Sequence, residues 1–140
     1  MKAAKITTNI ILLVFAILSV VRWDGDPTFH IAAGCGFAVF FIVHFLLNIK
    51  PFTAMTRRIT KLNAKSKRKY IIDMLLIIVW CGAIITGFIA ITNYSGDMSI
   101  HRIGRLHGVF ARVGCFLAIV HIFQHLKQIR SYFKTAKKTT

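Results

Sequence analysis

Four of the six histidines in this chain form two pairs with one common spacing. His30 and His44 are fourteen residues apart, and so are His107 and His121. In an α-helix, fourteen residues bring a side chain back to within about 40° of the same face, about 21 Å along the axis. Two axial imidazoles saturate a haem iron, which favours electron transfer over activation of oxygen or substrate. Two neighbouring helices of this kind therefore predict two stacked bis-histidine haems.

The matched depths assign the four ligands to two irons. His30 and His107 are expected to hold an outer haem, and His44 and His121 an inner one. A zinc or copper site is disfavoured, because it needs three or four ligands within about 2 Å of one ion. The sequence contains no C-x-x-C-H motif, so both haems are predicted to be of the non-covalent b type. The cysteines are interpreted as small packing residues within the spans: Cys35, Cys81 and Cys115.

The inner ligand on the last span has a competitor one turn away. His125 lies eighteen residues after His107 and shares its face, so the helical angle alone does not exclude it. Depth favours His121, because His125 would displace the ligand by about 6 Å. We expect His125 to contact a haem propionate or the headgroup layer, and His101 to be an interfacial residue on another face.

The elements that carry these histidines are predicted to be membrane helices. The chain has 140 residues, 56% of them apolar and only four acidic, which is typical of an integral membrane protein. The sequence predicts an all-α fold, a four-helix transmembrane bundle in a single domain, with spans at about residues 6–21, 28–49, 70–92 and 106–126. The first span could also be a signal peptide, but no small-residue cleavage site follows it.

The distribution of basic residues predicts the orientation. Fifteen lie near the two termini and in the loop of residues 50–69, against three in the other two loops. By the positive-inside rule, both termini and this basic loop are expected to be cytoplasmic. The net charge of +15 is then a topology signal rather than a sign of nucleic-acid binding. We expect a multi-pass protein of a prokaryotic cytoplasmic membrane, in contact with its lipids.

Local signals predict where the spans begin and end. Asp26 with Pro27 is expected to start the second helix, and Lys50-Pro51 to end it. Asp97 or Ser99 is a candidate cap for the last helix. In the basic loop, four apolar residues recur at helical spacing and favour a short surface helix over a solvated charge run: Phe52, Met55, Ile59 and Leu62.

Further residues are candidates for contacts with the haems. Gly34 lies one turn below His30, where a missing side chain would admit a macrocycle or simply allow helix packing. Asp73, inside the third span, is expected to snorkel or to pair with a loop cation, and a proton relay is the alternative. Arg112 lies within the last span, where a propionate or snorkelling would accommodate its charge. The other cations near the expected propionates are Arg22, Arg102 and Arg105 at the outer end and Lys50, Arg68, Lys69 and Lys127 at the inner end.

The second and fourth spans repeat one pattern beyond the histidines. His30-x11-Ile42-Val43-His44-x5-Lys50 matches His107-x11-Ile119-Val120-His121-x5-Lys127, which indicates either duplication of a helical hairpin or two copies of one solution. The doubled H-x13-H resembles the di-haem core of respiratory cytochrome b. The compact size and the His-x3-Gly-x9-His helix ending in Asn-x-Lys are more similar to the flavinylation-associated cytochrome family.

That resemblance implies electron passage across the cytoplasmic membrane, between a donor such as quinol and an extracytoplasmic flavoprotein. It leaves open whether the chain is a free-standing conduit or a redox subunit of a larger enzyme. The alternative from the residues themselves is a non-redox anchor or assembly subunit whose histidines make helix contacts.

Overall fold

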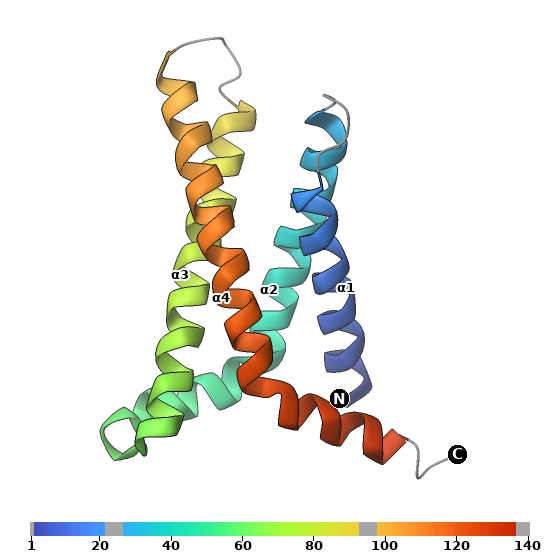
Figure 1. The fold of residues 1–140 in the computed structure, drawn as a ribbon, viewed down its shortest axis with the longest axis vertical. Helices are drawn as coiled ribbons and strands as arrows, with labels where there is room; N and C mark the ends of the chain where they lie inside the picture. Colours follow the sequence, from blue (N-terminus) through green and yellow to red (C-terminus); the bar gives the residue numbers. More distant parts are fainter. Residues whose placement is uncertain (1, 22–26, 93–97, 137–140) are drawn as a thin grey trace. The chain divides into compact units, whose positions relative to one another are not determined.

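The computed structural model describes the backbone of residues 2–21, 27–92 and 98–136, and the side chains of residues 3–21, 27–92 and 102–126. The described residues form α1 (Lys2–Val20), α2 (Pro27–Arg57), the short 3-10 turn η1 (Ile59–Lys61), α3 (Ala64–Thr92) and α4 (Met98–Ala136) (Figure 1). No strand occurs in this part of the chain. Each long helix contains a stretch that is long and apolar enough to cross a membrane. The prediction of an all-α protein with four membrane-spanning helices is confirmed.

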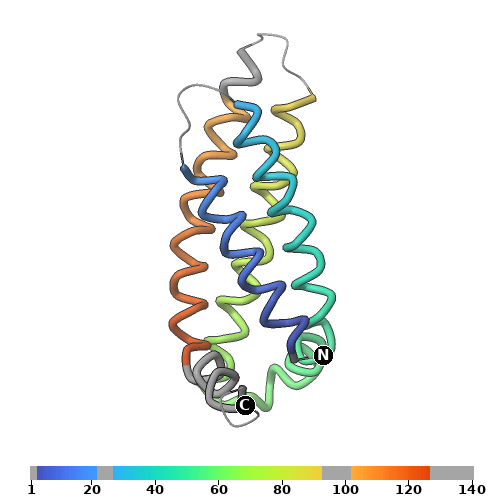
Figure 2. The backbone as a smooth tube through the Cα atoms, turned by 90° about the vertical axis from the view of Figure 1, so that its right-hand side faces the viewer, coloured from blue at the N-terminus to red at the C-terminus, as the bar shows by residue number. Residues whose placement is uncertain are grey.

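The chain divides into two units, Met1–Arg58 and Ile59–Thr140. In the first, α1 and α2 pack side by side in opposite directions, and in the second α3 and α4 do the same (Figures 1 and 2). We call these units the N-terminal and the C-terminal hairpin.

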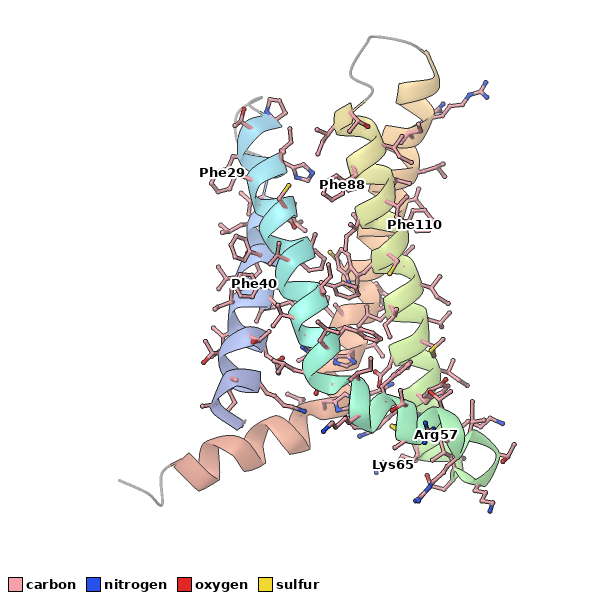
Figure 3. The ribbon with its side chains drawn as sticks, turned by 180° about the vertical axis from the view of Figure 1, so that it is seen from behind. Phe29, Phe40, Arg57, Lys65, Phe88 and Phe110 are labelled. Atoms are coloured by element: carbon pink, nitrogen blue, oxygen red, sulfur yellow. The ribbon has the colours of Figure 1, made fainter. Side chains whose placement is uncertain are left out.

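Aromatic residues and a glycine hold the N-terminal hairpin together. The rings of Phe15 and Phe40 stack with centroids 5.5 Å apart, which joins α1 to α2 (Figure 3). A Cβ atom at Gly36 would lie 2.4 Å from Cε1 of Phe15. The helices therefore approach this closely only because residue 36 has no side chain.

In the C-terminal hairpin, a glycine packs against an aromatic ring of the neighbouring helix at two positions. A Cβ atom at Gly114 of α4 would lie 3.0 Å from the ring of Trp80 on α3. A Cβ atom at Gly82 of α3 would lie 3.0 Å from the ring of Phe110 on α4 (Figure 3). Each helix thus contributes one glycine and one large aromatic residue to the contact.

The remaining apolar surface faces outward. Large side chains are exposed along all four helices, including Ile10, Val39, Ile78, Phe116 and Phe123. Exposed apolar area on this scale is costly in water and favourable in contact with lipid chains, so it fits the predicted membrane environment.

The prediction that Lys50-Pro51 ends the second helix is wrong. Pro27 is the first residue of α2 as expected, but the helix passes through Pro51 and ends at Arg57. Its last turns bend away from the preceding axis (Figure 1). Pro51 lacks an N–H and its ring crowds the preceding turn, which kinks the helix instead of stopping it. Just after the kink, the Thr53 hydroxyl donates to the carbonyl oxygens of Ile49 and Lys50, at 2.9 and 3.0 Å.

The predicted surface helix after Pro51 exists only in part. The stretch up to Arg57 continues α2, Ile59 begins η1, and Leu62 lies outside regular structure. The amphipathic pattern holds nevertheless, because the four apolar residues of the predicted helix are half-buried. Arg57 and Lys65, at the adjoining ends of α2 and α3, are exposed (Figure 3).

The third and fourth helices are longer than their predicted spans. Asn63 caps α3, since its Oδ1 accepts a hydrogen bond of 2.9 Å from the backbone N–H of Ser66. Helix α4 begins at Met98, which places Ser99 inside the helix and excludes it as the cap. The other predicted caps, Asp26 and Asp97, lie outside the described residues.

Candidate functional site

Both candidate ligands of the N-terminal hairpin are hydrogen-bonded to α1. The Nδ1 atom of His30 lies 2.8 Å from the carbonyl oxygen of Ser19. This carbonyl belongs to the last turn of α1, where helix carbonyls lack an intrahelical donor. The Nδ1 atom of His44 lies 2.8 Å from the side-chain oxygen of Asn9. Because these oxygens are acceptors, each imidazole donates through Nδ1.

The candidate ligands of the C-terminal hairpin make the same kind of bond to α3. The Nδ1 atom of His107 lies 2.9 Å from the carbonyl oxygen of Ala83, which also accepts from the Thr86 hydroxyl at 3.1 Å. The Nδ1 atom of His121 lies 2.7 Å from Oδ1 of Asp73. Again each imidazole donates through Nδ1 to an acceptor on the neighbouring helix.

The two hairpins share one hydrogen-bond register. In each, the two histidines are fourteen residues apart and their two acceptors are ten residues apart. The helices are antiparallel, so the first histidine pairs with the later acceptor: Ser19 rather than Asn9 on α1, and Ala83 rather than Asp73 on α3. The repeat seen in the histidine-bearing segments thus extends to the helices that position them. This pattern is consistent with the predicted duplication of a helical hairpin.

Donation through Nδ1 determines what the other ring nitrogen can do. In a neutral imidazole with a proton on Nδ1, the lone pair available to a metal is on Nε2. Metal-binding histidines are usually fixed in this way, with the second nitrogen bonded to a carbonyl or carboxylate oxygen. In each of the four rings, Nε2 is therefore the nitrogen that could coordinate a metal.

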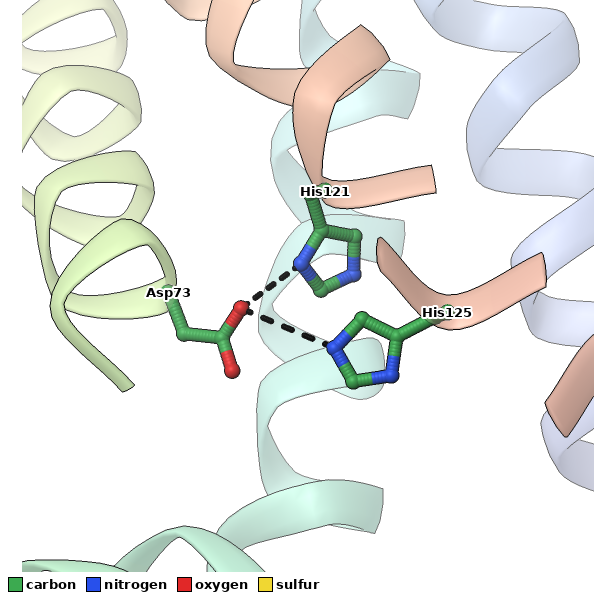
Figure 4. A network of polar contacts seen from close by, with 3 residues as sticks. All are labelled: Asp73, His121 and His125. Carbon is green, nitrogen blue, oxygen red and sulfur yellow. Dashed lines mark hydrogen bonds and ion pairs between the residues drawn. The ribbon is translucent and has the colours of Figure 1, made fainter. Parts of the chain in front are cut away.

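Asp73 also brings His125 into the site (Figure 4). Nε2 of His125 lies 3.9 Å from the Asp73 carboxylate, and its ring centroid lies 4.6 Å from that of His121. One ligand atom from each residue lies within 4.8 Å of the other two, a spacing that could hold a small metal ion. The expected contact of His125 with a propionate stays a prediction.

A glycine makes room for one of the rings. A Cβ atom at Gly87 would lie 3.1 Å from Cε1 and 3.3 Å from Nδ1 of His107. Gly87 is one turn beyond Ala83, so its missing side chain lets the imidazole reach the carbonyl. By contrast, no described atom lies within 4 Å of a Cβ built at Gly34, so the N-terminal hairpin leaves that position open.

The basic side chains that were predicted to contact the haem propionates are mostly exposed. Lys50, Arg68, Arg102, Arg105 and Arg112 are exposed, and Lys69 is half-buried. Arg22 and the side chains of Lys127 and His101 lie outside the described part of the structure.

Several residues of the site were missed in the sequence. Asn9 is not singled out in the sequence analysis, and Asp73 is expected there to snorkel, to pair with a loop cation or to relay protons, not to accept a hydrogen bond from a histidine. The available signal was their polarity within apolar stretches, since such side chains need a hydrogen-bonding partner in a membrane. The acceptors Ser19 and Ala83 act through backbone carbonyls, which carry no residue-specific signal.

Comparisons of the chain with protein-family models, curated proteins and solved structures find no match.

Proposed function

We propose that this protein carries electrons across a membrane through two b-type haems, one held by His30 and His107 and the other by His44 and His121. The observation that supports this most strongly is the common hydrogen bonding of the four imidazoles. Each donates Nδ1–H to an oxygen of its neighbouring helix and so presents Nε2 as the coordinating nitrogen. With this shared register, one such nitrogen would be available at each of two levels in each hairpin.

The residues fit haem as the cofactor. The donor set is four imidazoles without thiolates, and Gly34 leaves an open surface one turn from His30. When bound, a haem with two axial imidazoles supplies one-electron transfer and offers no open position for oxygen or substrate. The acceptors Ser19, Asn9, Ala83 and Asp73 hold the rings in the required tautomer and orientation.

Basic residues would neutralise the propionates in this proposal. We assign Arg22, Arg102, Arg105 and Arg112 to the outer cofactor, and Lys50 and Lys127 to the inner one. Arg112 fits this role best, because it lies ten residues inside the candidate span that begins at Arg102, and an arginine side chain at that depth needs an anionic partner.

The proposal extends to location and partners. The distribution of basic residues supports a cytoplasmic membrane location with both termini in the cytoplasm. Electrons would pass from quinol or another donor to an extracytoplasmic acceptor such as a flavoprotein, as the sequence resemblance implies. The chain would act alone or as the redox subunit of a larger complex.

The hydrogen bonds of the histidines also favour a second function, a non-redox membrane anchor or assembly subunit. In that case the bonds of His30, His44, His107 and His121 would serve only to join the helices of each hairpin. This function does not require the same ring nitrogen to donate in all four bonds, nor the fourteen-residue spacing in both hairpins.

Spectroscopy and cofactor extraction distinguish the two functions. The purified protein should show sharp haem bands that change between air-oxidised and dithionite-reduced samples. Acid–acetone should extract all of the haem, and a pyridine haemochrome assay should give two haems per chain. One haem or none per chain would overturn the proposal, and none would favour the anchor.

A further inference from the structure

The four imidazoles donate to acceptors of different charge. His30 and His107 donate to backbone carbonyl oxygens, and His44 donates to a neutral amide. His121 donates to the carboxylate of Asp73, and its bond of 2.7 Å is the shortest of the four. Hydrogen bonds to an ionised acceptor are typically shorter and stronger than neutral ones. The hydrogen-bond acceptors of the two levels therefore differ in one negative charge.

We infer that Asp73 is a positioning residue that lowers the reduction potential of the centre held by His44 and His121 below that of the centre held by His30 and His107. This inference rests on the proposed function. Electron transfer from the centre of His44 and His121 to the centre of His30 and His107 is then favourable, because an electron shared between them resides mainly on the centre of higher potential. With the expected topology, that is the outer centre.

The sign follows from elementary electrostatics. A carboxylate that accepts Nδ1–H makes the imidazole a stronger donor through Nε2. Oxidised iron carries one more positive charge than reduced iron, so a nearby anion stabilises the oxidised state and lowers the potential. The low dielectric of a membrane interior strengthens this effect relative to water. Hydrogen bonding and burial around the ligands are established means of tuning such potentials.

The surroundings of Asp73 favour this role over simple helix pairing. The same carboxylate oxygen, Oδ1, lies 2.7 Å from Nδ1 of His121 and 3.9 Å from Nε2 of His125. At the corresponding place in the N-terminal hairpin, Lys5 donates to Asn48 at 3.0 Å, and Asn48 in turn donates to the carbonyl oxygen of His44. The Lys5 charge acts on that ligand only through an intervening amide. The direct contact of Asp73 should therefore dominate.

The chain offers a matched pair of variants, because Asn9 occupies the position of Asp73 in the other hairpin. Asp73→Asn keeps a hydrogen-bond acceptor for His121 and removes the charge, whereas Asn9→Asp adds a charge beside His44. Potentiometric titration, followed by the reduced absorption bands, measures both centres in the purified holoprotein. The titration wave that is absent in His121→Ala identifies the centre in question.

In the wild type, this wave should have the lower midpoint of the two. Asp73→Asn should raise it by on the order of tenfold in the reduction equilibrium, which is about 59 mV for one electron. Asn9→Asp should lower the same wave by a similar factor. The wave of the other centre should stay in place in both variants and serves as the internal control.

The outcomes separate this inference from the proposed function. A wild-type protein without haem would contradict the proposed function itself. Two haems with unchanged waves in both variants would overturn the role of Asp73 and leave the proposed function intact. If Asp73→Asn fails to retain its haem, Asn9→Asp decides the question, since an unchanged or raised midpoint there contradicts the inference.

Discussion

At the scale of single residues, the placement of one proton on each imidazole decides what the ring can bind. A neutral histidine that donates through Nδ1 presents its lone pair on Nε2, and the four candidate ligands all do so. Their acceptors need not be alike: a helix-end carbonyl, an amide, a mid-helix carbonyl and a carboxylate serve the same purpose. The charge of the acceptor would then alter the donor strength of Nε2 without changing the orientation of the ring.

The competition between His121 and His125 gives a prediction at this scale. The bond of His121 to Asp73 repeats the register of the other hairpin, whereas His125 reaches the same carboxylate only at 3.9 Å. His121→Ala should therefore remove one haem and leave the other, and His125→Ala should retain both. Haem content per chain measures this directly. The opposite result would show that the ligand lies one turn further along α4.

A second prediction concerns the space beside His107. Gly87→Ala would place a methyl group about 3 Å from the imidazole. The ring must then shift from the Ala83 carbonyl, and we expect about tenfold weaker retention of the haem that it holds. Competition for haem with an excess of apomyoglobin would measure this loss.

Gly82→Ala is the matched control for this prediction. It creates an equally tight contact on the same helix, but with Phe110 instead of a histidine. It should loosen the hairpin without a selective effect on one haem. Equal effects of the two substitutions would mean that Gly87 serves only in packing.

At the scale of helices, each histidine-bearing helix depends on its neighbour in the same hairpin. Helix α1 contains no histidine, yet it provides the acceptors for both histidines of α2. Helix α1 therefore does more than pack against α2. The distance between the two helices decides whether the bonds form, and in the N-terminal hairpin Gly36 and Phe15 control that distance.

Gly36→Ala tests this dependence. Its Cβ would overlap the Phe15 ring, so the ring or the two helices must shift, and we expect a loss of roughly 1–3 kcal/mol in the free energy of unfolding. The added Phe15→Leu substitution should restore part of it. Denaturant titration of the haem-free protein in detergent, followed by circular dichroism, measures both changes.

Gly34→Ala, two residues earlier on the same helix, provides the contrast. The new methyl group meets no described atom within 4 Å, so the stability of the haem-free protein should change little. If a macrocycle lies against this face, Gly34→Ala should instead weaken haem retention. Loss of stability without loss of haem would contradict the proposed cofactor contact.

At the scale of the whole molecule, two hairpins carry the same hydrogen-bond register while their sequences differ at most positions. The four long helices and their exposed apolar side chains fit a multi-pass membrane protein. The basic loop between the hairpins contrasts with the sparse charge of the loops within them. If this asymmetry sets the orientation, the second histidine of each pair, His44 or His121, is the one nearer the cytoplasm.

Cysteine labelling tests the orientation. After replacement of the three native cysteines, Ser66→Cys should react with an impermeant maleimide only when the cytoplasmic side is accessible. Ser95→Cys should react only from the outside. Permeabilised cells provide the control that both sites can be labelled. Reversed accessibility would invert the orientation and exchange the names of the outer and inner centres.

The sequence by itself determined the features that depend on local composition and spacing. Apolar runs predicted the four helices, because a membrane span is recognised from the mean hydropathy of consecutive residues. The repeated fourteen-residue interval identified the candidate histidines. Local signals failed at Pro51, where the flanking helical turns outweigh the missing hydrogen bond and the helix bends instead of ending. The predicted spans of α3 and α4 are also shorter than the helices, because polar and basic residues extend a helix beyond its apolar stretch.

Only the tertiary structure decided which oxygen each imidazole reaches. The acceptor of His121 is 48 residues away in the chain, and that of His107 is 24 residues away, so both depend on the register of packed antiparallel helices. Any helix residue has a carbonyl, and nothing in the sequence distinguishes those of Ser19 and Ala83. The tautomer of each ring, the space left by Gly87 and the single carboxylate beside His121 all follow from that register.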